Sequence, residues 1–329
     1  MKIKQLLCIL LLYICCSAVL TMAFADSGSL SIIFNEDISY PATVPYDKVE
    51  RIRLDENTVK QAIEKYRLPP RAGEKWNLEV NKCSNPDCVL QFKERNGAAG
   101  TLSYDFAGIS AHGEGEKYSR ASDTVKAFLD EIGLVNYEYP FYFCHDAYLA
   151  HNTSPWHPIT VEDYLSENGT YQRKLWERTG GSPVLVVVRF QIGEIPFGTS
   201  ISWTQFTDRS GNGNPTPSAF FLISENGEIC AAHIRNPVKV IKRRESGEKI
   251  LPWKTVFEMS RSKIENVFCG GDNRSDNLTL QHVELVMLTD DKSITFPAWN
   301  FVFEWYSPEN DRYLVLGLMY NAFTGEQVW

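Results

Sequence analysis

The chain has 329 residues, of which 43% are hydrophobic and 22% are charged, a composition typical of a globular protein and not of a disordered one. Its formal net charge of −8 argues against nucleic acid as a partner, because binding to phosphates requires a basic face. After residue 25, no stretch approaches the roughly 20 apolar residues of a membrane-spanning helix.

Residues 1–25 have the pattern of a signal peptide. Two lysines precede an apolar run from Leu6 to Leu20, and Ala23 and Ala25 fit a cleavage site before Asp26. The sequence therefore predicts a secreted or extracytoplasmic protein. The alternative is that the segment stays uncleaved, and only then is a membrane expected as a partner.

Residues 26–118 are predicted to form a small N-terminal α+β unit. Val59, Ile63 and Tyr66 fall on one face of a helix from near Glu56 to Tyr66, with Asp55 as its candidate N-cap. Alternating apolar residues then predict an antiparallel meander of three strands near 76–80, 89–92 and 102–106.

Cys83 and Cys88 lie in this unit, on either side of the turn sequence Ser-Asn-Pro-Asp. Export would permit oxidation, so a disulfide between the two is one expectation. The other is that they are ordinary hairpin residues, because pairing depends on geometry that the spacing does not show.

The segment 119–238 is predicted to begin with a helix that Ser122 caps and Gly133 ends. Strands are expected at 184–190 and 197–203, and a hairpin is expected to join 220–223 to 228–234. Asn226-Gly227 at the centre of this hairpin predicts a type I′ turn.

The segment 239–329 follows the same order of elements. A basic run at 239–244 is predicted to be a solvated connection, and a helix follows from Trp253 to the stop at Gly270-Gly271. Strands are expected at 282–288, 295–305, 313–321 and 327–329. Trp299 is predicted to lie in the core.

One pattern occurs in both segments. Phe-Phe-Leu-Ile-Ser-Glu-Asn-Gly-Glu-Ile-Cys at 220–230 and Leu-Met-Tyr-Asn-Ala-Phe-Thr-Gly-Glu-Gln-Val at 318–328 each pass through a Gly-Glu turn, and a strand with Pro196 or Pro297 precedes each. No catalytic residue is repeated with the pattern, which favours a binding scaffold over an enzyme. The predicted fold is α+β, with two helix-on-antiparallel-sheet units in tandem after the N-terminal unit.

The second copy resembles the PepSY-like repeat, in the form found in extracytoplasmic regulatory proteins of the YycH/YycI type. The resemblance rests on Val-Glu-Leu-Val-Met at 283–287, Phe-Pro-Ala-Trp at 296–299 and Tyr-Asn-Ala-Phe-Thr-Gly-Glu at 320–326, and it extends more loosely to residue 120. The chain is also similar to exported proteins of Gram-positive bacteria, many of them lipoproteins. The resemblance implies an extracytoplasmic regulatory role and brings no catalytic residues with it.

The first copy contains an insert at about 137–180 that is rich in aromatic residues. Exposed aromatic side chains with polar tips suit recognition of peptide or glycan. The alternative is that they complete the core of the unit. The candidate ligand or partner residues are Tyr139, Tyr142, Tyr148, Trp156 and His157.

Motifs that carry enzyme chemistry are missing from the sequence or incomplete in it. Nucleophile-elbow, zincin and phosphate-loop motifs are not found, and Ser260 with Lys263 fits Ser-x-x-Lys without its companion motifs. The sequence therefore predicts no catalytic residue, cofactor or metal. It favours a non-catalytic binding or regulatory protein whose partner is a protein or a cell-wall ligand, and it predicts no oligomeric state.

Two other classes of function stay open. His145, His151 and His157 follow one another at steps of six residues, so a secreted hydrolase or metal-dependent enzyme that uses this region is one alternative. A structural subunit of a surface assembly is the other.

Overall fold

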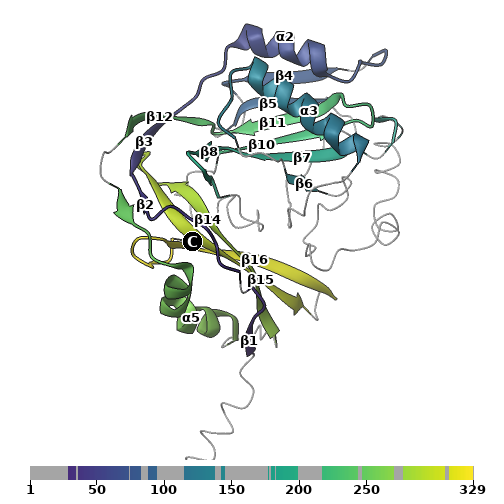
Figure 1. The fold of residues 1–329 in the computed structure, drawn as a ribbon. Helices are drawn as coiled ribbons and strands as arrows, with labels where there is room; N and C mark the ends of the chain where they lie inside the picture. The colour runs from purple at the N-terminus through teal and green to yellow at the C-terminus, as the bar shows by residue number, and fades with distance from the viewer. Residues whose placement is uncertain are drawn as a thin grey trace, which may run out of the picture.

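The computed structural model describes residues 29–34, 36–73, 75–82, 88–94, 115–137, 142–144, 177, 179–181, 183–198, 217–243, 247–269, 277–307 and 311–328. In these residues the protein has two main sheets, and helices cover one face of each (Figure 1). The predicted α+β class is confirmed.

The larger sheet is antiparallel and has six strands in the order β4-β5-β11-β10-β7-β6. Helices α2 (Glu56–Tyr66) and α3 (Glu116–Glu131) lie side by side over one of its faces (Figure 1). All residues of β7, β10 and β11 are buried, so these strands form the centre of this half of the molecule. The strands are β4 (Trp76–Val80), β5 (Cys88–Glu94), β6 (Tyr142–Cys144), β7 (Val184–Arg189), β10 (Ser218–Ile223) and β11 (Ile229–Arg235).

The smaller sheet has four strands in the order β1-β14-β15-β16. Helix α5 (Trp253–Cys269) covers one face, where the Phe257 ring lies 5.4 Å from that of Phe301 and 6.5 Å from that of Phe303. The opposite face carries a second apolar cluster of Val286, Leu288, Ala298 and Met319. The strands are β1 (Ser29–Ile32), β14 (Asn277–Thr289), β15 (Thr295–Ser307) and β16 (Arg312–Asn321).

Three short ribbons complete the described fold: β3 (Asp47–Arg51) with β12 (Val238–Arg243), β2 (Thr43–Val44) with β13 (Glu248–Lys249), and β8 (Gln191–Ile192) with β9 (Ile195–Pro196). The β3–β12 ribbon runs between the two halves of the molecule (Figure 1). Positions 239–243 of β12 are exposed, and Lys239 Nζ lies 2.8 Å from a carboxylate oxygen of Glu50. The predicted solvated connection is therefore confirmed for these residues.

Among the described residues of 26–118, strands β1, β4 and β5 belong to the two main sheets. Strands β4 and β5 pair as predicted, but β5 also pairs with β11 and so extends the larger sheet. Strand β1 joins the smaller sheet, in parallel with β14. β5 covers an edge of β11 and β1 covers an edge of β14, and each of these edges would otherwise expose unpaired backbone groups. The third strand predicted for this unit, at 102–106, lies outside the described residues.

Two of the described helices, α2 and α3, test the capping signals of the sequence. α2 has the predicted bounds, and Asp55 Oδ1 accepts a hydrogen bond of 2.8 Å from the Thr58 amide. α3 ends before Gly133 as predicted (φ of 80°), but it begins at Glu116, and Ser122 is a buried residue inside it. Its additional first turn is polar and contains the Glu116–Arg120 ion pair at 2.8 Å, so the apolar pattern alone did not reveal it.

The two proline segments differ in position. Pro297 lies in β15, near the end of its pairing with β16, whereas Pro196 belongs to β9, which pairs only with β8 in the described structure. The strand predicted at 197–203 is not formed at its first two residues. Phe197 makes an isolated bridge to Met287 of the smaller sheet. In the described part of the strand predicted at 327–329, Gln327 makes an isolated bridge to Tyr320, and the Val328 amide donates to Met319 O at 2.8 Å.

The two glycine turns, in contrast, have similar surroundings. Both glycines have positive φ, 91° at Gly227 and 73° at Gly325. A Cβ on Gly227 would meet Arg120 of α3 at 2.9 Å, and one on Gly325 would meet Met259 of α5 at 2.6 Å. Each turn therefore packs against the helix of its own sheet.

The turn at Gly227 is not of type I′, because that type requires positive φ at Asn226 as well, and Asn226 is not among the residues with positive φ. The Gly227 amide donates to Ser224 O at 3.0 Å, and the Ser224 amide donates to Glu228 O at 2.8 Å. This is a type I turn followed by a left-handed glycine in a bulge, a common solution for slightly longer hairpins.

We expect Gly227→Ala to destabilise the protein by about 2–3 kcal/mol, because a left-handed alanine costs about 1–2 kcal/mol and its methyl group also displaces Arg120. That displacement would disturb the hydrogen bond of 3.1 Å from Arg120 to Glu225 O. Gly193→Ala is the matched control, since Gly193 has φ of 63° and open space around its Cβ position. Urea unfolding of both variants measures the difference, and equal losses would contradict the packing role of the turn.

Candidate functional site

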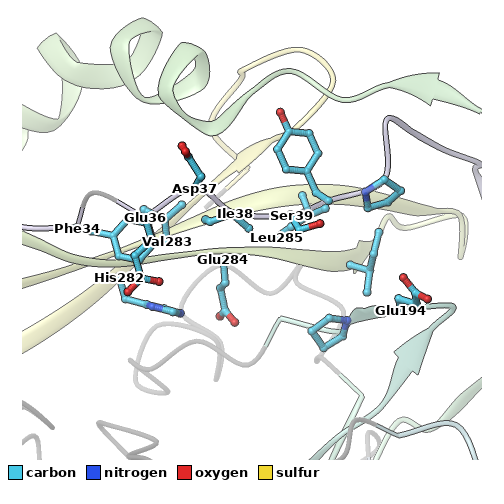
Figure 2. A pocket seen from close by; sticks show the side chains of 14 residues that line it. Phe34, Glu36, Asp37, Ile38, Ser39, Glu194, His282, Val283, Glu284 and Leu285 are labelled. Carbon is cyan, nitrogen blue, oxygen red and sulfur yellow. The ribbon is translucent and has the colours of Figure 1, made fainter.

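A groove of about 590 Å³ lies along the outer edge of β14, where the two halves of the molecule meet (Figure 2). Three segments that are far apart in the sequence line it. They are the chain after β1 (Phe34 and 36–41), residues 194–196 of the β8–β9 ribbon, and residues 282–285 of β14.

Three ring contacts hold the first of these segments in place. The Phe34 ring lies 5.7 Å from Trp253 of α5, edge to face, and 5.7 Å from His282. The Tyr40 ring lies 5.1 Å from Trp299, also edge to face. Edge-to-face pairs favour one orientation of the rings, so both ends of this groove wall are fixed on the core of the smaller sheet.

The outer edge of β14 is paired at both ends of the groove. On one side β1 pairs with it, and the amides of Ile33 and Phe34 donate to Leu280 O at 3.3 and 3.2 Å. On the other side the Gly198 amide donates to Met287 O at 3.1 Å. The edge of β14 is therefore covered up to Leu280 and again from Met287.

Between these two points no strand of the described structure pairs with the outer edge of β14. In an antiparallel pair, alternate residues turn their backbone groups to the partner and away from it. The Asp290 amide donates to Ile294 O at the start of the β14–β15 hairpin, so Asp290 turns its backbone groups toward β15. Even-numbered residues of this part of β14 therefore face β15. The odd-numbered residues Val283, Leu285 and Met287 turn their backbone groups outward. Within the described part of the chain no hydrogen bond reaches these outward groups.

Carboxylates line both sides of this open stretch. Glu36, Asp37 and Glu194 are exposed, and Glu284 is half-buried. Asp37 Oδ1 lies 3.5 Å from Lys254 Nζ, a solvated contact that contributes little. In Figure 2 the side chains of His282 and Glu284 lie on the opposite side of β14 from Asp37. A ligand in the groove would therefore meet negative charge from two directions.

Glu284 also connects the two halves of the molecule. It accepts a hydrogen bond of 2.7 Å from Arg189 of β7 and one of 3.0 Å from the Asn300 amide group. Burial raises the pKa of Glu284, but the charges of Arg189 and His282 and the hydrogen bond from Asn300 outweigh burial and hold the pKa below its usual value. The carboxylate is therefore ionised at neutral pH and anchors the guanidinium of the other sheet.

Most residues that the sequence singled out lie elsewhere. Tyr142 belongs to β6, at the edge of the larger sheet and away from the groove. Cys88 is buried in β5, where its thiol donates to Leu90 O at 3.0 Å. Outside the described residues lie Tyr139, Tyr148, Trp156, His157, Cys83, His145 and His151, so the aromatic insert, the disulfide and the histidine region stay predictions.

The Ser-x-x-Lys pair of the sequence has a structural explanation at its serine. Ser260 is buried inside α5 and its hydroxyl donates to Val256 O at 2.8 Å, a helix-internal contact. Across the described ranges, no group of three or more His, Cys, Asp and Glu side chains is placed to hold a metal ion. In the same ranges no helix is long and apolar enough to cross a membrane.

The groove residues were not predicted from the sequence, although one signal for them was present. Glu284 is a charged residue in the apolar run 283–287, and a charge in such a run is either solvated or paired. Its partner Arg189 is likewise a charged residue, at the end of the otherwise apolar strand β7.

Comparison with known proteins returns little. No family model matches the chain, and no curated protein matches it. Among solved structures, the Bacillus megaterium YpeB C-terminal domain matches with a TM-score of 0.32 and 9% sequence identity, over 84% of this chain and 96% of that chain. A similarity this low does not establish a common fold.

Proposed function

We propose that the protein is an exported, non-catalytic binding module that takes its ligand in the groove along β14. In this proposal the two helix-covered sheets are PepSY-like units in tandem, and their junction forms the binding site. The partner is a protein or cell-wall ligand outside the cytoplasm, and binding serves a regulatory role.

The observation that carries this proposal is the gap in the edge of β14. Exposed strand edges are usually blocked, because they recruit other chains. Here β1 blocks one part and Phe197–Gly198 another, while Val283 and Leu285 between them keep outward backbone groups without a partner in the described structure. Two fixed walls around an open edge are the geometry of a site that receives a ligand.

A photo-crosslinking amino acid in place of Ser39, which lines the groove and is exposed, tests the proposal. We expect one discrete crosslinked species from the cell envelope of the host, which then binds the purified protein at one-to-one stoichiometry. The same amino acid in place of Asp123, exposed on α3, is the matched control. N-terminal sequencing of the exported protein should begin at Asp26.

Equal crosslinking at the two positions would contradict a site in the groove. An intact N-terminus on protein retained in membranes would contradict release by cleavage, but not binding. The two parts of the proposal are therefore tested separately.

A further inference from the structure

We infer that the ligand of this groove is an extended polypeptide segment with a cationic side chain at every second position, bound by strand addition to β14. The inference rests on the proposed function, since it specifies the ligand of the same site. It follows from the backbone of β14, from the two sides of the groove and from its charge.

The backbone of β14 determines the form of the ligand. Val283 and Leu285 each present an outward amide and an outward carbonyl, and a neighbouring strand satisfies such groups at a spacing of about 4.8 Å. At about 3.3 Å per residue, positions 281–286 span about 20 Å and accept a segment of up to about six residues. An extended main chain satisfies all four groups, whereas a helix, whose backbone groups are already bonded to one another, satisfies none.

The two sides of the groove determine the pattern of side chains. Successive residues of a strand point to opposite faces. One face of an added strand would contact the wall that Ile38 and Tyr40 form, and the other would contact Glu194 and Glu284. One set of alternating side chains is thus expected to be apolar where it meets Ile38 and Tyr40, with Glu36 and Asp37 at the Phe34 end of the same wall, and the other set is expected to be polar.

The charge of the groove determines the sign of the polar set. Glu36 and Glu194 are exposed and have no ion pair in the described structure. Lysine or arginine side chains complement these carboxylates and carry apolar stems that pack along the strand. An acidic segment would be repelled from both sides of the groove. Charge complementarity therefore favours a basic segment over a neutral or acidic one.

Fluorescence anisotropy with the labelled peptide Lys-Val-Lys-Val-Lys-Val and the intact protein tests the inference. We expect saturable one-to-one binding that weakens as salt is added, because the charges are exposed. N-methylation of the backbone nitrogens on one edge of the peptide should weaken binding about tenfold, because it removes main-chain hydrogen bonds and keeps the charge. Glu-Val-Glu-Val-Glu-Val should not bind.

The double variant Glu36→Gln/Glu194→Gln should weaken binding of the Lys-Val peptide about three- to tenfold at low salt. Asp123→Asn/Asp291→Asn removes the same charge from exposed sites elsewhere and should leave the affinity unchanged. If both double variants weaken peptide binding equally, the peptide responds to the net charge of the protein, and its assignment to this groove is wrong. Unchanged binding of the N-methylated peptide would overturn strand addition.

The outcomes separate this inference from the proposed function. Discrete crosslinking at position 39 without binding of the Lys-Val peptide would refute the basic extended ligand and leave the binding module intact. A dimer that forms with rising concentration and that the peptide does not dissociate would make a second copy of the chain the occupant, which also refutes the inference. Loss of both crosslinking and peptide binding would refute the two together.

Discussion

Glu284→Ala is expected to destabilise the protein by about 3–5 kcal/mol, because removing one partner of a buried ion pair costs far more than the pair contributes. The side chains of Arg189 and Glu284 are 4% and 16% exposed, and their 2.7 Å contact joins β7 to β14. Without the carboxylate, the guanidinium loses its anionic partner at the junction of the two halves. The midpoint of urea unfolding measures the loss.

The control for this prediction is the double variant Arg189→Met/Glu284→Leu, which removes both charges and keeps apolar volume. It should recover a large part of the stability that Glu284→Ala loses, because two buried charges no longer require desolvation. If the double variant is as unstable as the single one, the packing of these side chains matters more than their charge.

The same pair predicts a dependence of stability on pH. The pKa of Glu284 is held below its usual value, so its stabilising effect is complete above the pKa of the unfolded chain, about 4.3. The effect is lost as the pH falls through the lower pKa of the folded state. The stability difference between the wild type and Glu284→Gln should therefore shrink as the pH falls below about 4.

Elements with local signals were predicted well from the sequence. Helix α2 combines an N-cap at Asp55, an apolar face and a stop at Pro69-Pro70, all within 16 residues of one another, and it has the predicted bounds. The hairpins of β10 with β11 and of β14 with β15 also formed, because a short turn brings neighbouring strands together with little loss of chain entropy.

Pairings between distant segments could not be predicted in this way. The parallel pairing of β1 with β14 and the pairing of β5 with β11 depend on which edges are open after the sheets form, and no periodicity within β1 or β5 specifies a partner. The candidate site depends on such pairings, since its walls come from 34–41, 194–196 and 282–285. The local patterns of the sequence therefore indicated the aromatic insert as the candidate site. The signal for the groove was Glu284, a charged residue in an apolar strand.

Trp299→Ala is the second large loss that we expect, about 3–5 kcal/mol, the range for removal of a fully buried aromatic side chain. Trp299 was predicted to be a core residue, and its exposed fraction is 0%. Its indole Nε1 donates to Leu251 O at 2.8 Å, just before α5 begins, and its ring contacts Tyr40 in the groove wall. The substitution therefore removes contacts to the start of the helix and to the wall as well as apolar area.

Trp299→Phe separates these contributions. Phenylalanine keeps most of the ring area but leaves Leu251 O without its donor, so we expect a smaller loss of about 1–3 kcal/mol. Tyr40→Leu, which keeps apolar bulk in the wall but removes the edge-to-face contact, should cost only about 0.5–1.5 kcal/mol. Thermal unfolding followed by near-ultraviolet circular dichroism measures all three variants.

If Trp299 orders the groove wall, Trp299→Ala should weaken binding of the Lys-Val peptide at temperatures where the variant is still folded. Trp299→Phe should bind the peptide nearly as well as the wild type does. Unchanged affinity in folded Trp299→Ala would show that the wall at Tyr40 is not part of the binding site.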